Sequence, residues 1–356
     1  MENIKAKFDF DDILIVPSIH TEISSRYKDI KLPEILPLFT APMDTVVDLN
    51  NVKLFDNAGI NVALPRTIKY EDSFNFIEEN YHSGSFTKIF ISMGFDDIDK
   101  HLANNLKLVK YNSCILIDVA NGHMDKIVDY AKKIKAIKPE VQIMVGNIAN
   151  PETYYWYWMH GCVDYIRIGI GNGNGCLTTK QSGIGYPMAS LIYEIKQIKN
   201  KIEALNQGKA PYIVADGGMK DYSDITKSLA LGADFVMIGS IFNKALESSA
   251  KNYLYGIRIG KRLAKFAFKK GFPIKKYFRG MSTKGAQKAM GKTSFKTSEG
   301  VVRIRKVEYT LDGWVENFEH YLRNAMSYAN AKTLNEFIGK VEICQISKNA
   351  YDRFNK

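Results

Sequence analysis

A short apolar run followed at once by a glycine-rich loop decides the fold of this chain. The run is Asp164-Tyr165-Ile166-Arg167-Ile168, and the loop continues as Gly169-Ile170-Gly171-Asn172-Gly173-Asn174-Gly175-Cys176-Leu177-Thr178-Thr179. Glycine lets the backbone adopt positive φ and approach a ligand closely. Because the loop presents a thiol and, two residues later, a hydroxyl, it predicts covalent catalysis by Cys176. The alternative is a flexible turn that carries a buried cysteine by chance.

Seven further apolar runs recur along the chain at intervals of roughly two to three dozen residues. They cover residues 35–41, 60–64, 88–93, 114–119, 141–145, 212–215 and 235–238. Most are continuously apolar, as parallel strands buried on both faces require. Helical patterns lie between them, for example at residues 124–137 and 222–231. Eight such units predict an α/β fold, the closed (β/α)8 TIM barrel, with a doubly wound open sheet as the alternative.

Polar and glycine-rich segments follow several of these predicted strands, so a barrel would gather them at one face. They are Asp44, Asp118 with Asn121, Gly146-Asn147, the cysteine loop, Asp216-Gly217-Gly218 and Gly239-Ser240. The loops after the last two strands of a barrel often bind phosphate through backbone N–H groups. Gly280-Met281-Ser282 could add donors, and Asp216 could accept hydrogen bonds from sugar hydroxyls. Together they predict a bound ribose phosphate, and therefore a nucleotide.

Composition narrows the class of protein further. The 356 residues include four widely spaced cysteines and no CxxC pair, which predicts neither a disulfide framework nor a zinc site. The N-terminus lacks an apolar signal core, and no run approaches the length of a membrane span. We therefore expect a cytoplasmic protein with no membrane partner.

The net charge of +11 is concentrated in a helix-like stretch at residues 251–279. Such a stretch could bind RNA or a membrane surface, attract a phosphorylated substrate, or be a solvated face. A solvated face is favoured, and nucleic acid binding is not expected, because no nucleic-acid-binding motif accompanies the charge. The last hundred or so residues fall outside the strand–helix rhythm, and residues 280–300 have the composition of a mobile flap. We expect one catalytic domain over residues 1–356, with this flap and a C-terminal extension.

The motifs, in their order along the chain, resemble those of the IMP dehydrogenase and GMP reductase superfamily. They are Phe10-Asp11-Asp12-Ile13-Leu14-Ile15-Val16-Pro17, Ala41-Pro42-Met43-Asp44-Thr45-Val46, Gly146-Asn147, the cysteine loop, Ala215-Asp216-Gly217-Gly218, Val236-Met237-Ile238-Gly239-Ser240 and Arg279-Gly280-Met281-Ser282. The resemblance implies a (β/α)8 barrel, a homotetramer and a purine nucleoside monophosphate as substrate.

Four features resemble the GMP reductase branch. They are Asp118-Val119-Ala120-Asn121-Gly122, Gly183-Ile184-Gly185-Tyr186-Pro187, Ser298-Glu299-Gly300 without the Arg-Tyr pair of dehydrogenases, and the lack of room for an inserted regulatory domain. The resemblance implies that Cys176 attacks C2 of GMP, that Thr178 and Glu299 assist departure of ammonia, and that NADPH reduces the thioimidate to release IMP. The alternatives are an IMP dehydrogenase without a regulatory domain and a non-catalytic barrel that binds nucleotides or RNA.

The remaining site assignments also rest on the resemblance. Asp118 and Asn121 are the expected cofactor-binding residues, and the carbonyls of Gly171, Gly173 and Cys176 would hold a monovalent cation such as K⁺. The expected substrate-binding residues are Met43, Asn174, Asp216, Gly218, Gly239, Ser240, Gly280, Met281 and Ser282.

Overall fold

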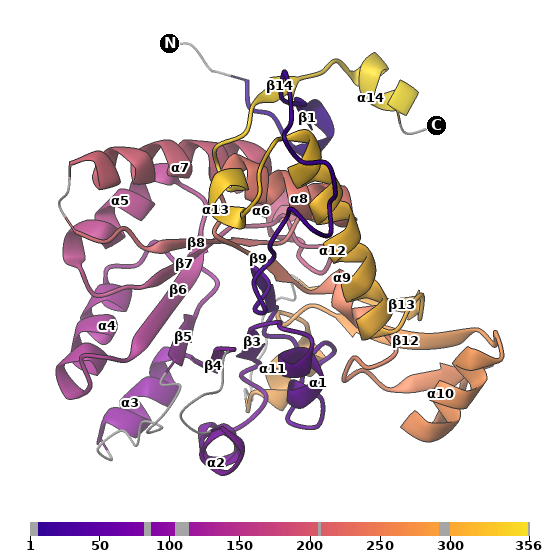
Figure 1. Cartoon of the computed structure of the whole chain (residues 1–356). Coiled ribbons are helices and arrows are strands. Elements are labelled where there is room, and N and C mark those ends of the chain that lie inside the picture. The colour runs from indigo at the N-terminus through magenta and orange to yellow at the C-terminus, as the bar shows by residue number, and fades with distance from the viewer. Residues whose placement is uncertain (1–5, 82–86, 104–113, 206–207, 292–299, 355–356) are drawn as a thin grey trace.

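Eight parallel strands form the central sheet in a computed structural model that describes residues 6–81, 87–103, 114–205, 208–291 and 300–354 (Figure 1). A parallel bridge between Phe39 and Asn61 joins the two edge strands and closes the barrel. The neighbours run in the order β2-β9-β8-β7-β6-β5-β4-β3. The strands are β2 Leu38–Thr40, β3 Val62–Leu64, β4 Ile89–Met93, β5 Cys114–Asp118, β6 Gln142–Ile148, β7 Tyr165–Ile168, β8 Tyr212–Asp216 and β9 Phe235–Ile238. The eight predicted runs and the (β/α)8 fold are confirmed.

One predicted boundary is wrong, because β6 continues through Gly146 and Asn147 instead of ending before them. The pairing register with β7 shifts between Gly146 and Ile148. A shift of this kind changes the direction in which a strand residue points. Asn147 lies at this shift, and its side chain reaches the ends of the neighbouring strands, as described below.

The barrel interior is filled by side chains, since Phe39, Phe90, Tyr165 and Met237 are all at most 1% exposed and belong to one apolar cluster. A second and larger cluster lies between the strands and the outer helices. The helices that follow successive strands are α1 Val52–Asn57, α2 Tyr70–Asn80, α3 Phe95–Ala103, α4 Lys126–Ile137, α5 Pro151–His160, α7 Met188–Ala204, α8 Tyr222–Leu231 and α12 Leu311–Tyr328. Among the described residues, α2 is the one helix between β3 and β4.

The chain departs from the strand–helix rhythm between β9 and α12, where it builds an antiparallel sheet. Its strands are β10 Asn252–Leu254, β11 Ile257–Ile259, β12 Ile274–Arg279 and β13 Val302–Lys306, with helices α10 Lys261–Lys269 and α11 Lys284–Ala289. The expected helix-like stretch at 251–279 is therefore wrong, because one nine-residue helix lies between strands. The expectation that the last hundred residues leave the rhythm is partly wrong, since α12 supplies the eighth outer helix.

Lys276 of β12 anchors this sheet to the barrel. Its ammonium group is fully buried and donates hydrogen bonds to the carbonyls of Ala245, Leu246 and Ser248, at 2.8–3.1 Å. Burial lowers the pKa of Lys276 to about 7. These carbonyls belong to the segment that follows β9, the last strand of the barrel. The ammonium group therefore holds β12 against that segment.

The two ends of the chain meet, because β1 Ile13–Ile15 pairs antiparallel with β14 Ile343–Gln345. The other short elements outside the barrel are η1 Phe10–Asp12, α13 Leu334–Phe337 and α14 Lys348–Phe354. Within the part of the chain that the structure describes, no helix has the length and apolar character needed to cross a membrane.

We expect Trp314→Ala in α12 to lower the free energy of unfolding by about 3–5 kcal/mol, because it removes a large buried side chain. Trp314 is 2% exposed and stacks on Phe318 and on Tyr222 of α8. Urea denaturation followed by circular dichroism measures the change. Tyr193→Ala, at a side chain 45% exposed, is the control and should change stability by less than about 0.5 kcal/mol. Equal losses in the two variants would contradict the role given to α12.

Candidate active site

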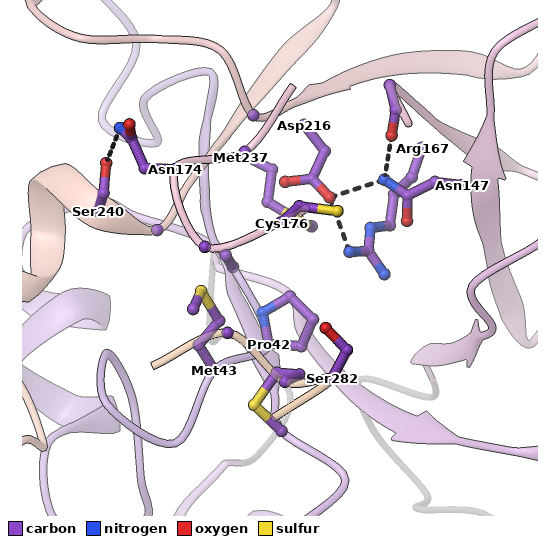
Figure 2. Close-up of a pocket in the computed structure, with 18 of the residues that line it drawn as sticks. Pro42, Met43, Asn147, Arg167, Asn174, Cys176, Asp216, Met237, Ser240 and Ser282 are labelled. Atoms are coloured by element: carbon purple, nitrogen blue, oxygen red, sulfur yellow. Dashed lines mark hydrogen bonds and ion pairs between the residues drawn. The ribbon is translucent and has the colours of Figure 1, made fainter. Parts of the chain in front are cut away.

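A cavity of about 510 Å³ opens at the carboxyl ends of the barrel strands. Figure 2 shows that Cys176, Asp216, Arg167 and Asn147 approach it from one side, with Met43 and Ser282 on the other. Its walls come from loops after β2, β3, β5, β7, β8 and β9, from Asn147 of β6 and Arg167 of β7, and from the segment after β12. The expected gathering of the strand-end segments at one face is thus present.

The cysteine loop places a thiol next to a hydroxyl. Cys176 is half-buried, and its Sγ lies 3.2 Å from Oγ1 of Thr178, to which it donates a hydrogen bond. Thr178 begins the short helix α6, Thr178–Ser182. The loop can turn back on this helix because Gly171 has φ +81°, and a Cβ there would lie 1.7 Å from Oγ1 of Thr179. Both reactive groups therefore face the cavity.

Backbone hydrogen bonds join the cysteine loop to the segments around Gly280 and Val301. The amide of Val301 donates to the carbonyl of Gly175 and the amide of Gly280 donates to that of Val301, both at 3.1 Å. A Cβ on Gly280 would lie 2.3 Å from the carbonyl oxygen of Gly175, so only glycine fits there. Cys176 itself forms an antiparallel bridge with Gly300. The chain on both sides of residues 292–299 therefore borders Cys176.

The middle of the cysteine loop carries a small polar group suited to an anion. Nδ2 of Asn174 donates a hydrogen bond to Oγ of Ser240 at 3.0 Å, which links the loop after β7 to α9 Ser240–Asn243 (Figure 2). Gly218 and Gly239 also line the cavity. No carboxylate belongs to this group, so phosphate would meet no direct repulsion from it.

A buried arginine lies between two carboxylates on the charged wall of the cavity. Nη1 of Arg167 is 2.6 Å from Oδ1 of Asp118, and its Nη2 is 2.7 Å from Oδ2 of Asp216. Arg167 is 6% exposed. Burial opposes its charge, but attraction to Asp216 and Asp118 outweighs this effect and raises the pKa of Arg167. The guanidinium is therefore held charged between the ends of β5 and β8.

Asn147 extends this network to the start of the cysteine loop. Its Nδ2 donates to the carbonyl of Gly169 and to Oδ2 of Asp216, both at 2.9 Å. Asn147 and Arg167 thus donate to the same oxygen of Asp216, Oδ2. Reasoning from the sequence named Asp216 but missed Arg167, whose signal was a single basic residue inside an otherwise apolar strand.

Most of the predicted site residues line the cavity. They are Met43, Asp118, Gly171, Gly173, Asn174, Cys176, Thr178, Asp216, Gly218, Gly239, Ser240, Gly280, Met281 and Ser282. Asn121 does not: it is exposed on the loop after β5, where its Oδ1 accepts a hydrogen bond from the amide of His123. Glu299 lies outside the described residues. Arg66 lines the cavity as a further cation, 3.2 Å from Asp97.

The three carbonyls expected to hold a monovalent cation belong to the same loop. The carbonyl of Gly173 accepts a hydrogen bond from the amide of Cys176 at 3.0 Å. A carbonyl oxygen has two lone pairs, so this bond leaves one for an ion. Hard oxygen ligands of this kind fit K⁺.

The fold and the site define a (β/α)8-barrel protein with a cavity at the carboxyl ends of its strands. A thiol and several polar groups line this cavity. The family model described as "IMP dehydrogenase / GMP reductase domain" matches residues 7–353, so the chain belongs to that family. The resemblance deduced from the motifs is confirmed.

Curated relatives match over nearly their whole length. The chain is 27% identical to a protein named GMP reductase from Caenorhabditis elegans, covering 98% of this chain and 94% of that protein. It is 26% identical to human GMP reductase 1, covering 96% of each. It is 28% identical to GMP reductase from Buchnera aphidicola, covering 98% of this chain and 97% of that protein.

We expect Arg167→Leu to lower the free energy of unfolding by about 3–5 kcal/mol, because it leaves two half-buried carboxylates without their cation. Lys220→Leu is the control, since its ion pair with Asp11 is exposed at the surface and should contribute at most about 1 kcal/mol. Urea denaturation of both variants measures the difference. If Arg167→Leu were as stable as Lys220→Leu, the network would not hold the strand ends together.

Proposed function

We propose that this protein is an NADPH-dependent GMP reductase, which converts GMP to IMP and ammonia through a covalent intermediate on Cys176. The observation that carries the proposal is the pairing of Cys176 with Thr178 at 3.2 Å in a cavity that the polar side chains of Asn174 and Ser240 also line. Three of the relatives compared above bear the name GMP reductase. The family alone would also admit the dehydrogenase reaction.

The proposed binding mode follows the polarity of the cavity. The phosphate of GMP lies against Ser240, Asn174 and the backbone N–H groups of Gly218 and Gly239. Oδ1 of Asp216 accepts hydrogen bonds from the ribose hydroxyls, while Oδ2 keeps its hydrogen bonds from Arg167 and Asn147. Met43, Gly280, Met281 and Ser282 border the base. This placement directs C2 of guanine toward Sγ of Cys176.

Chemistry begins when the thiolate of Cys176 attacks C2, forming a C–S bond while the ring nitrogen takes up the electron pair. Thr178, with a proton relayed from Glu299, protonates the exocyclic amine so that the C–N bond breaks and ammonia leaves. The thioimidate that remains accepts a hydride at C2, and the C–S bond then breaks to release IMP. The 3.2 Å contact between Oγ1 of Thr178 and Sγ of Cys176 supports this role for Thr178.

NADPH, when bound, supplies that hydride. The residues of this chain suited to hold it are Asp118 and Arg66, since both line the cavity. The carbonyls of Gly171, Gly173 and Cys176 would hold K⁺ and so stiffen the loop. We also propose a cytoplasmic homotetramer acting in purine salvage, in keeping with four free cysteines among the described residues.

The purified protein should consume NADPH in the presence of GMP, with IMP and ammonia as products identified by chromatography. Absorbance at the reduced-nicotinamide band measures the reaction. Production of NADH and XMP from IMP and NAD, without any consumption of NADPH, would assign the chain to the dehydrogenase branch instead.

Cys176→Ala should abolish this turnover, because no other group can form the covalent bond, while GMP still binds in an equilibrium titration. Cys344→Ala is the matched control: this cysteine is exposed and remote from the cavity, and its removal should leave the rate unchanged. Undiminished turnover in Cys176→Ala would rule out the mechanism.

Thr178→Val should lower kcat by about 10²–10⁴-fold, because it removes the group that delivers a proton to the leaving amine. Steady-state kinetics with GMP measure the effect, and the KM for GMP should change much less than kcat. A loss confined to KM would mean that Thr178 only binds substrate.

A further inference from the structure

The net positive charge of the chain comes from residues 251–306, which we call the basic lobe. Seventeen Lys and Arg residues lie in this segment against one acidic residue, Glu299, whereas the rest of the chain has 32 Lys and Arg against 37 Asp and Glu. The lobe therefore carries a formal charge of +16 and the remainder −5, from a total of +11. A charge of this density on one unit predicts a polyanionic partner.

The basic lobe also exposes apolar side chains. Of the 20 exposed large hydrophobic residues among those that the structure describes, eight belong to it. They are Tyr255, Ile257, Leu263, Phe266, Phe272, Tyr277, Val302 and Ile304. Exposed apolar side chains scattered singly are ordinary, but a concentration of them marks an interaction site.

Helix α10 combines both features. Ala264 and Ala267 are buried and pack in one apolar cluster with Ile274 of the sheet, so this face of the helix is covered. Leu263 and Phe266 are 51% and 59% exposed on another face. The exposed lysines and arginines of the helix complete its surface: Lys261, Arg262, Lys265 and Lys269. A helix with lysines beside exposed Leu and Phe is typical of segments that lie in a membrane interface.

Strand pairing collects further apolar groups beside α10. Leu254 pairs with Ile257 and with Ile274, so the turn at Tyr255 and the residue Phe272 lie at the same end of the sheet. Tyr255 and Ile257 are 74% and 70% exposed. Figure 1 shows the sheet and α10 extending away from the barrel. The lobe therefore projects its charged and apolar groups beyond the rest of the molecule.

Other partners explain less of this surface. A solvated face needs the charges but not the apolar side chains. Single-stranded nucleic acid stacks on aromatic rings, yet Ile257, Leu263 and Ile304 have no π-face. Two lobes of +16 would repel each other, so contact between the lobes of two copies is disfavoured.

We propose that the basic lobe binds the surface of an anionic membrane, with Leu263, Phe266 and the neighbouring apolar side chains in the interface and the lysines against lipid phosphates. The nine residues of α10 are roughly 14 Å long, too short to span a bilayer. The lobe therefore lies on the surface. This proposal is independent of the reaction proposed above, because α10 contributes no residue to the cavity.

Co-flotation of the full-length protein with vesicles tests the proposal. We expect the protein to float with vesicles of phosphatidylcholine and phosphatidylserine, to stay behind with phosphatidylcholine alone, and to be released by high salt. Lys269→Glu with Lys270→Glu should weaken binding by at least about tenfold. Leu263→Ser with Phe266→Ser should weaken it to a similar degree, about tenfold, by removing the inserted groups.

Matched controls separate a specific surface from general charge. Lys132→Glu with Lys133→Glu makes the same charge change on α4, and Ile137→Ser with Tyr193→Ser removes side chains of similar exposure. Both control pairs should bind as the unmodified protein does, and every variant should keep its rate of GMP-dependent NADPH oxidation.

Three results would overturn the proposal. The first is no flotation of the unmodified protein with anionic vesicles. The second is retention of a single-stranded oligonucleotide, without vesicle binding, that depends on the lysines alone and so identifies nucleic acid as the partner. The third is that the unmodified protein binds no vesicles and that Leu263→Ser with Phe266→Ser has a lower molecular mass by light scattering. That result would identify a second copy of the chain as the partner.

Discussion

The ion pairs of Arg167 with Asp118 and Asp216 are the constraint on which the rest of the site depends. A guanidinium that is 6% exposed is tolerated only with its charge compensated. The two carboxylates come from the ends of β5 and β8, and Arg167 itself lies on β7. Because the cysteine loop starts two residues later, at Gly169, the position of the thiol is set by where these three strands end.

A second set of contacts ties the cysteine loop to the basic lobe. Gly175 and Gly280 approach so closely that no Cβ fits on Gly280, and the guanidinium of Arg279 pairs with Asp44 after β2. Lys276 adds its buried hydrogen bonds to the segment after β9. The part of the lobe around the end of β12 therefore lies at the cavity, whereas α10 contributes no residue to it.

Much of the fold could be predicted because parallel strands buried on both faces have continuous apolar sequences. All eight runs are strands, and most of the predicted site residues that the structure describes lie at the ends of these strands or directly after them, whereas Gly280, Met281 and Ser282 follow β12. The basic lobe was misread because β10, β11 and β12 are short and α10 lies between them, so their periodicities overlap within 28 residues, from Asn252 to Arg279. Asn121 is three residues from Asp118 but does not line the cavity, since its side chain accepts a hydrogen bond from the amide of His123 in the same loop.

The sequence by itself determined the strand–helix order, the proximity of the Cys176 thiol to the Thr178 hydroxyl, and the family, since each depends on residues close together in the chain. Only the tertiary structure decided that Arg167 pairs with residues 49 positions away on either side, and that α12 resumes the barrel after an inserted sheet. The physical reason is that the charge pairing of a buried side chain depends on which strand ends meet in space. Local periodicity and residue type do not show which strand ends are neighbours in the folded chain.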